Sequence, residues 1–147
     1  MFKSVLKSNL LLLLLFLLDR LIKYLVIHLL PLKGAFVSPY LKIKATLNPH
    51  LALSLPLANY LAAILSLIIT VILIYYLIKS AKISLPLYFS LGLVIIGAIS
   101  NLLDRFKFAG VIDYLDLWRL PTFNLSDLYI IIGLLLLTLS LRKLGKL

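Results

Sequence analysis

Cysteine and glutamate are both absent from this chain of 147 residues. The absence of cysteine excludes disulfide bonds, thiolate nucleophiles and cysteine-ligated metal sites. Acidic side chains are scarce, since the five acids, all aspartates, stand against 15 basic residues. Only 14% of the residues are charged and 63% are hydrophobic, which is far from the composition of a soluble globular domain. The composition therefore predicts a protein that is embedded in the lipid bilayer.

Four apolar stretches are long enough to cross a membrane, for which about 20 residues are needed. We expect an all-α membrane protein of one domain, residues 1–147, with four transmembrane helices. The region of about residues 31–56 is rich in proline and β-branched residues, which predicts an extracytoplasmic loop region that could include short β-strands. The expected spans cover about residues 8–30, 57–78, 85–103 and 124–141.

The basic residues indicate how these spans are oriented. One side collects seven basic residues on short segments without an acid: Lys3, Lys7, Lys79, Lys82, Arg142, Lys143 and Lys146. By the positive-inside rule this side is cytoplasmic, so both termini are expected there and all aspartates at or near the other face. The net charge of +10 then reflects topology and anionic lipids, and no nucleic-acid partner is expected. The first span lacks a small-residue cleavage site after it, and we expect it to be retained.

Four of the five aspartates lie between Asp104 and Asp127, next to the ends of two apolar stretches. A carboxylate at the centre of a span costs about 2.5 to 3.5 kcal/mol, and less towards the interface. Two carboxylates close together in a low dielectric share one proton and so supply an acid and a base at the same pH. Such a pair can activate water for amide hydrolysis. The candidates for it are Asp104, Asp113, Asp116 and Asp127.

Five short blocks carry polar residues in an order and spacing that one family shares. They are Asp19 to Lys23, Asn48 to Leu53, Gly97 to Arg105, Gly110 to Asp116, and Pro121 to Asp127. In these blocks the chain resembles signal peptidase II, the bacterial lipoprotein signal peptidase family. The resemblance covers the whole chain, with its four spans.

The resemblance implies an aspartic endopeptidase of the bacterial cytoplasmic (inner) membrane that uses no metal and no organic cofactor. Its catalytic pair falls on Asp113 and Asp127. The substrate that it implies is a prolipoprotein with a diacylglyceryl group on a cysteine, cut just before that cysteine. Membrane lipids are the other expected partners, and we expect a monomer. Supporting or substrate-binding positions fall on Asp19, Lys23, Asn48, Asn101, Asp104, Arg105 and Asn124.

The sequence departs from the family pattern at four positions. His50 and Leu53 stand where the family has a glycine and an aromatic residue, and Ser100 and Ser126 replace a glycine and an alanine. Loss of a glycine can forbid a positive φ angle, which bears on the loop around Asn48. No departure removes a carboxylate, so we expect an active member.

Several of these residues also have a structural interpretation. Asn124 and Asp127 are spaced as a capping box at the start of the last helix, which is compatible with catalysis. Asp19 and Lys23 stand at i and i+4, where an ion pair is expected. Asp104 lies towards the end of a helix, where the dipole disfavours an acid, so we expect it to have a partner.

The remaining polar residues of the last blocks are expected to support or flank the pair. Asn101 and Arg105 are predicted to form a hydrogen-bonded shell that orients the pair or the scissile carbonyl. Asp116 is expected to be a loop acid or to pair with Arg119. Such an exposed ion pair contributes about 0 to 1 kcal/mol to stability. The aromatic residues of a second loop, expected over residues 104–123, are predicted to anchor the chain at headgroup level and could also line the entry for acyl chains: Tyr114, Trp118 and Phe123.

A small four-helix transporter or channel is the competing class. Such a protein places an ionisable residue near the middle of a span, and the second and fourth spans contain no charged residue in their interior. The two histidines, His28 and His50, lack the spacing typical of zinc sites.

Overall fold

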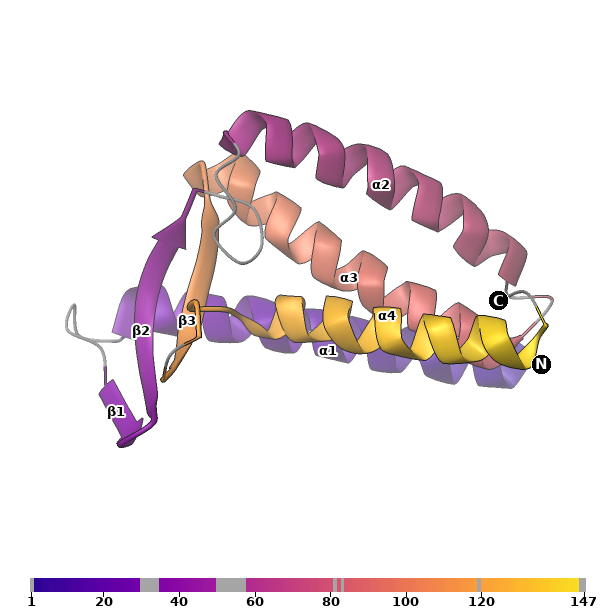
Figure 1. Cartoon of the computed structure of the whole chain (residues 1–147), viewed down its shortest axis with the longest axis horizontal. Coiled ribbons are helices and arrows are strands. Elements are labelled where there is room, and N and C mark those ends of the chain that lie inside the picture. The colour runs from indigo at the N-terminus through magenta and orange to yellow at the C-terminus, as the bar shows by residue number, and fades with distance from the viewer. Residues whose placement is uncertain are drawn as a thin grey trace.

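The computed structural model describes residues 2–29, 35–49, 58–80, 82, 84–118 and 120–145. Within these residues the helices lie alongside one another and the strands lie at one end of the bundle (Figure 1). The start of α1 and the end of α4 lie at the opposite end. The elements in chain order are α1 (Phe2–Leu29), β1 (Ala35–Ser38), β2 (Leu41–Asn48), α2 (Asn59–Ser80), α3 (Leu85–Phe108), β3 (Val111–Leu117) and α4 (Leu125–Lys143).

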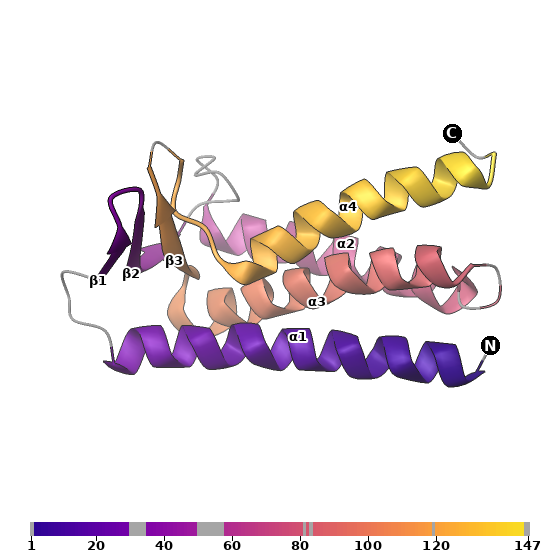
Figure 2. The same cartoon turned by 90° about the horizontal axis from the view of Figure 1, so that it is seen from below.

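The central helix is α3, which packs against α1, α2 and α4. Figure 2 shows it between α1 and α4. Its most apolar 18-residue stretch is 61% buried, against 17% for those of α2 and α4. The outer helices expose large apolar side chains along their length, such as Leu14, Ile68 and Leu135. Exposed apolar surface of this extent is stable in contact with lipid and not in water.

Three helices of the described residues, α2, α3 and α4, are long and apolar enough to cross a membrane. With 28 residues α1 has the length as well, but it carries Asp19, Arg20 and Lys23 in its second half. Membrane crossing by α1, and with it the count of four spans, stays a prediction.

Three of the helices, α1, α3 and α4, are longer than the expected spans, whereas α2 has the expected length and lies two residues later. Helix α1 begins at Phe2 instead of about residue 8, and α3 ends at Phe108 instead of about residue 103. Asp104 and Arg105 are therefore helical and do not belong to the second loop. The all-α expectation also needs a correction, because a three-stranded antiparallel sheet in the order β1-β2-β3 is present. Strands β1 and β2 fall in the loop region for which short strands were considered, whereas β3 was not expected.

Helices α3 and α4 come very close together just before their polar residues. A Cβ atom at Gly97 would lie 2.5 Å from the main-chain oxygen of Ser126, so this contact requires glycine. Asn101 lies one turn after Gly97, and Asp127 directly follows Ser126. The close approach therefore brings Asn101 next to Asp127.

Strand β3 connects the sheet to the bundle. Helix α3 is followed by Ala109 in the left-handed conformation, with φ of 56°, and the chain then turns into β3. Strand β3 pairs antiparallel with β2, and Asn48 lies opposite Val111 in this register. Residues two apart on a strand share a face, so Asn48 is a diagonal neighbour of Asp113.

Candidate active site

Asp113 lies on β3 and lines a cavity of about 570 Å³. Its Oδ2 atom accepts a hydrogen bond of 2.9 Å from the Asn48 side chain, and its Oδ1 atom accepts one of 2.7 Å from the Asn124 side chain. Asn124 reaches it because the chain folds back after β3 and Phe123 pairs with Leu115. Both oxygens of this buried carboxylate thus have an amide donor.

Asp127 lines the same cavity from the first turn of α4. Its N–H donates to the Asn124 Oδ1 atom at 3.0 Å, and its Oδ2 atom accepts from the Asn124 N–H at 3.1 Å. The predicted capping box is therefore confirmed. The Oδ1 atom of Asp127 accepts a bond of 2.8 Å from the Asn101 side chain, as expected of an orienting residue.

Asn124 contacts both carboxylates at once. Its side-chain nitrogen donates to Asp113, while its main chain and its side-chain oxygen bind Asp127. It is completely buried, so water does not compete for these bonds. One residue thus fixes the relative position of the two acids, which come from β3 and α4.

Burial raises the pKa of Asp113 to about 6 from an ordinary 3.8. The hydrogen bond from Asn48 lowers this pKa, the negative charge of Asp127 raises it, and the bond from Asn124 and the charge of Lys23 lower it. The charge of Asp127 therefore favours a proton on Asp113, as in a pair that shares one proton. A carboxyl group with this pKa can donate a proton near neutral pH.

The rest of the cavity wall is mainly apolar. Arg105 is a cation on the wall, and it also donates a bond of 3.0 Å to Asn59 at the start of α2. The apolar lining comes from α2, α3, α4 and the segment after β3, and includes Ile69, Leu73, Val94, Phe123, Ile131 and Leu134. A cavity with a few convergent polar groups and apolar walls is typical of a site that binds a largely apolar ligand.

Besides Asn124, three predicted supporting residues, Asp19, Lys23 and Asp104, are not among the described residues that line this cavity. They form a buried cluster between α1 and α3. The Lys23 Nζ atom lies 3.2 Å from Asp19 and 2.7 Å from Asp104, which confirms the first pair. It also donates to the Asn101 Oδ1 atom at 3.0 Å. Lys23 thereby holds the amide of Asn101 with its nitrogen towards Asp127.

Asp104 has basic partners, as expected for an acid towards the end of a helix, and both partners come from α1. Arg20 lies 2.6 Å from its Oδ1 atom and Lys23 lies 2.7 Å from its Oδ2 atom. Arg20 was missed in the sequence, where it stands beside Asp19 as an ordinary basic residue at the end of a span. The cluster contains two acids and two bases, so its formal charges balance.

Asp116 lies on β3 but forms an ion pair with Lys44 of β2, at 2.8 Å. The expected alternative partner, Arg119, lies outside the described residues. Both side chains of the observed pair are about one third exposed, at 29% and 33%, so solvent screens the interaction.

Asp116→Asn is therefore expected to be nearly silent. It removes an exposed pair worth about 0 to 1 kcal/mol, and the residue is not among the described residues that line the cavity. Peptidase assays and thermal unfolding of the purified variant check this. A loss of activity as deep as that of Asp113→Asn would show that the wrong acid of the two had been assigned.

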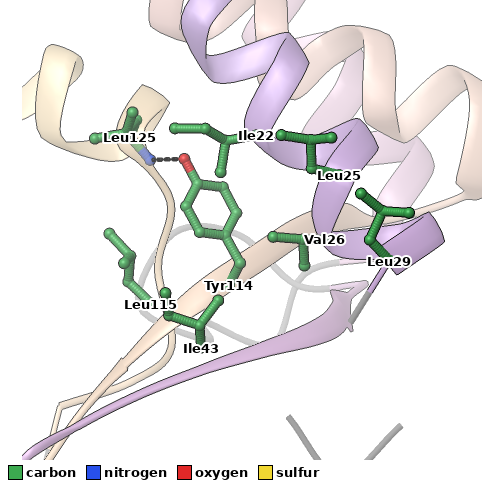
Figure 3. A pocket seen from close by; sticks show the side chains of 8 residues that line it. All are labelled: Ile22, Leu25, Val26, Leu29, Ile43, Tyr114, Leu115 and Leu125. Carbon is green, nitrogen blue, oxygen red and sulfur yellow. Dashed lines mark hydrogen bonds between the residues drawn. The ribbon is translucent and has the colours of Figure 1, made fainter. Parts of the chain in front are cut away.

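The three aromatic residues of this region have different surroundings. Tyr114 is only 2% exposed and is not an interfacial anchor. Its ring lines a second cavity of about 350 Å³ between α1, the sheet and α4, and its hydroxyl accepts a bond from the Leu125 N–H (Figure 3). Phe123 lines the larger cavity. Trp118 is 58% exposed, as the anchor role requires.

Of the two histidines, only His28 lies within the described residues. Its ring packs against that of Tyr24, with centroids 4.4 Å apart and planes inclined at 46°. No group of three or more potential metal ligands occurs among the described residues. His50 and Leu53, two of the departures from the family pattern, lie outside those residues.

The fold and the cavity define a class of protein, namely a membrane bundle with a cavity that two carboxylates line, at the end that carries the sheet. Residues 11–143 match the family model described as signal peptidase (SPase) II. The lipoprotein signal peptidase of Coxiella burnetii strain RSA 493 is 33% identical over 132 residues, which are 82% of this chain and 80% of that protein. The chain therefore belongs to the signal peptidase II family.

Other relatives agree over shorter stretches. The lipoprotein signal peptidase of Halothermothrix orenii is 39% identical over 92 residues, which are 63% of this chain and 63% of that protein. The match to the one from Caldicellulosiruptor bescii spans 53% of that protein, so the chain covers less than two thirds of either. Two solved structures of a bacterial membrane enzyme superpose with TM-scores of 0.84 and 0.80, at 27% and 26% identity. They cover 93% and 92% of this chain, which covers 88% and 92% of theirs.

Proposed function

We propose that this protein is an aspartic endopeptidase that removes the signal peptide from diacylglyceryl-modified prolipoproteins, cutting just before the lipidated cysteine. The observation that carries the proposal is the single cavity lined by both Asp113 and Asp127, with Asn124 hydrogen-bonded to each. Membership of the signal peptidase II family supports this activity. The relatives' name, lipoprotein signal peptidase, supports the class of substrate.

In the proposed mechanism Asp127 is the base and Asp113 carries the shared proton. Asp127 takes a proton from water while the water oxygen attacks the scissile carbonyl carbon, and Asp113 protonates the carbonyl oxygen. Asp113 then recovers its proton as the C–N bond breaks, and Asp127 passes the other proton to the leaving amine. The helix dipole stabilises the charge of Asp127 at the start of α4. This scheme requires neither a metal ion nor an organic cofactor.

The apolar walls of the cavity suit a substrate that is itself held in the membrane. Side chains from α2, α3 and α4 line it beside the two acids, so an extended signal peptide can enter between helices while its acyl chains stay in lipid. We place this end of the bundle near the extracytoplasmic face and both termini in the cytoplasm, with α1 as the fourth span. We further propose that residues 1–147 form one domain that acts as a monomer.

Cleavage of a lipidated precursor by the purified protein tests this function. We expect a product that begins with the diacylglyceryl cysteine, identified by mass spectrometry. The matched control is the same precursor with serine in place of that cysteine, which cannot carry the lipid and should remain uncut. Equal cleavage of both precursors, or of neither, would contradict the proposal.

A further inference from the structure

Asp19 is completely buried, and its carboxylate lies where four elements meet. A buried carboxylate is costly unless hydrogen-bond donors and a cation surround it. Lys23 supplies the cation, from the same face of α1. The other donors come from α3, β3 and α4, so Asp19 connects the three elements that carry Asn101, Asp113 and Asp127.

Three hydroxyl groups converge on this one carboxylate. Ser100 of α3 and Ser126 of α4 donate to the Oδ2 atom at 2.6 Å and 2.7 Å. Tyr114 of β3 donates to the Oδ1 atom at 3.3 Å. We call Ser100, Tyr114 and Ser126 the hydroxyl cage. Both serines are departures from the family pattern.

The same groups bind the first turn of α4, whose N–H groups lack partners within the helix. The Leu125 N–H donates to the Tyr114 hydroxyl at 3.1 Å, and the Ser126 N–H donates to Asp19 at 3.3 Å. The Asp127 N–H is bound by Asn124. Tyr114 and Asp19 thus act as additional caps, supplied from β3 and α1, for the turn that carries Asp127.

Each member of the hydroxyl cage is a direct neighbour in sequence of a residue that lines the larger cavity. Ser100 precedes Asn101, Ser126 precedes Asp127, and Tyr114 follows Asp113. Successive residues of a strand point to opposite faces, so the Tyr114 hydroxyl holds β3 from the face opposite Asp113. A shift of any one cage member therefore moves the adjacent cavity residue.

We propose that the hydroxyl cage around Asp19 is a positioning device that sets the separation of Asp113 and Asp127. Its members do not touch the substrate and act through the main chain of their neighbours. Because Ser100, Tyr114 and Ser126 share one acceptor group, they act as a unit. This inference rests on the proposed function, since its readout is the rate of the peptidase.

Tyr114→Phe tests the proposal, because it removes one hydroxyl and keeps the ring that packs against α1 and α4. We expect kcat to fall by about 10- to 100-fold, as displacement of catalytic groups by a fraction of an ångström to about one ångström does, while KM changes by less than about threefold. Ser126→Ala and Ser100→Ala should act in the same direction. In an Asp19→Asn background, which removes the shared acceptor, Tyr114→Phe should cost less than in the wild type.

Two control variants separate positioning from general stability. Tyr40→Phe removes an exposed hydroxyl of the sheet region, and Ser90→Ala removes a buried hydroxyl of α3 that donates to the Leu87 carbonyl. Both should keep kcat within about twofold. All assays are made below the onset of thermal unfolding of each variant. If Tyr114→Phe does not fold, Ser126→Ala decides the same question.

The pH dependence of kcat is a second readout, because a loss of stability alone does not shift its midpoint. The charge of Asp127 raises the pKa of Asp113, so a wider separation of the acids should shift the Asp113 midpoint to lower pH. Unchanged kcat and pH profile in all three hydroxyl variants, with an inactive Asp113→Asn protein, would overturn the positioning role alone. An active Asp113→Asn protein would overturn the proposed function instead.

Discussion

Asp113→Asn and Asp127→Asn are each expected to lower the rate of prolipoprotein cleavage by about 10³-fold or more. Asparagine cannot exchange a proton with water or with the leaving amine, so either change removes one half of the proposed acid–base pair. Groups that act as a unit are strongly non-additive, and the double variant should be no slower than the worse single one. Assays with the lipidated precursor measure these rates.

The two variants must remain folded for this test to decide anything. Asparagine preserves the size of the side chain but turns an NH2 group towards one of the two donors that each carboxylate accepts from, so we expect both proteins to fold with a modestly lowered thermal midpoint. Asp116→Asn is the matched control for Asp113→Asn, since it removes the same charge from the same strand. If both variants keep most of their activity, neither residue is catalytic.

Lys23→Met is expected to reduce the free energy of unfolding by about 3 to 5 kcal/mol. Lys23 is the cation between Asp19 and Asp104, and its side chain is 1% exposed. Without Lys23, Arg20 remains as a cationic partner of Asp104 but not of Asp19. An uncompensated buried charge is strongly destabilising. Thermal or denaturant unfolding in a fixed detergent measures the effect.

The chain offers both a control and a rescue for this change. Lys44→Met breaks the partly exposed pair with Asp116 and should cost no more than about 1 kcal/mol. Lys23→Met combined with Asp19→Asn removes both charges of one pair and should recover part of the lost stability. A Lys23→Met protein as stable as Lys44→Met would contradict the assignment of the cluster as a buried ion network.

The helices could be predicted well from the sequence because long apolar runs have few alternatives. Three of them are confirmed as candidate spans, and the paired strands β1 and β2 fall in the region where strands were considered possible. Strand β3 was missed although Val111-Ile112-Asp113-Tyr114 combines β-branched and aromatic residues, which favour strands. Asp113 and Asp116 interrupt this pattern, because aspartate is uncommon in strands. Recognition of the strand would have placed Tyr114 on the face opposite Asp113.

The site could be predicted only in part. The spacing of Asn124 and Asp127 is local, and the capping box that it predicted is present. The partners of Asp104 are not local, since Arg20 stands 84 residues away along the chain. A single sequence shows that a buried acid requires a cation but not which of 15 basic residues supplies it. The hydroxyl cage was missed for the same reason, because serine has many ordinary roles in a helix.

Infrared titration of the Asp113 carboxyl tests most directly whether the two acids share a proton. Protein with isotope-labelled aspartate is compared with Asp113→Asn, so that the difference isolates this group. Burial raises its pKa to about 6, so Asp113 should keep its proton at pH 5, where an ordinary aspartate has lost it, and release it around pH 6. In Asp127→Asn the midpoint should move to lower pH, because the charge that favours the proton is gone. A titration midpoint near pH 4 that stays the same in Asp127→Asn would show that the acids do not face each other.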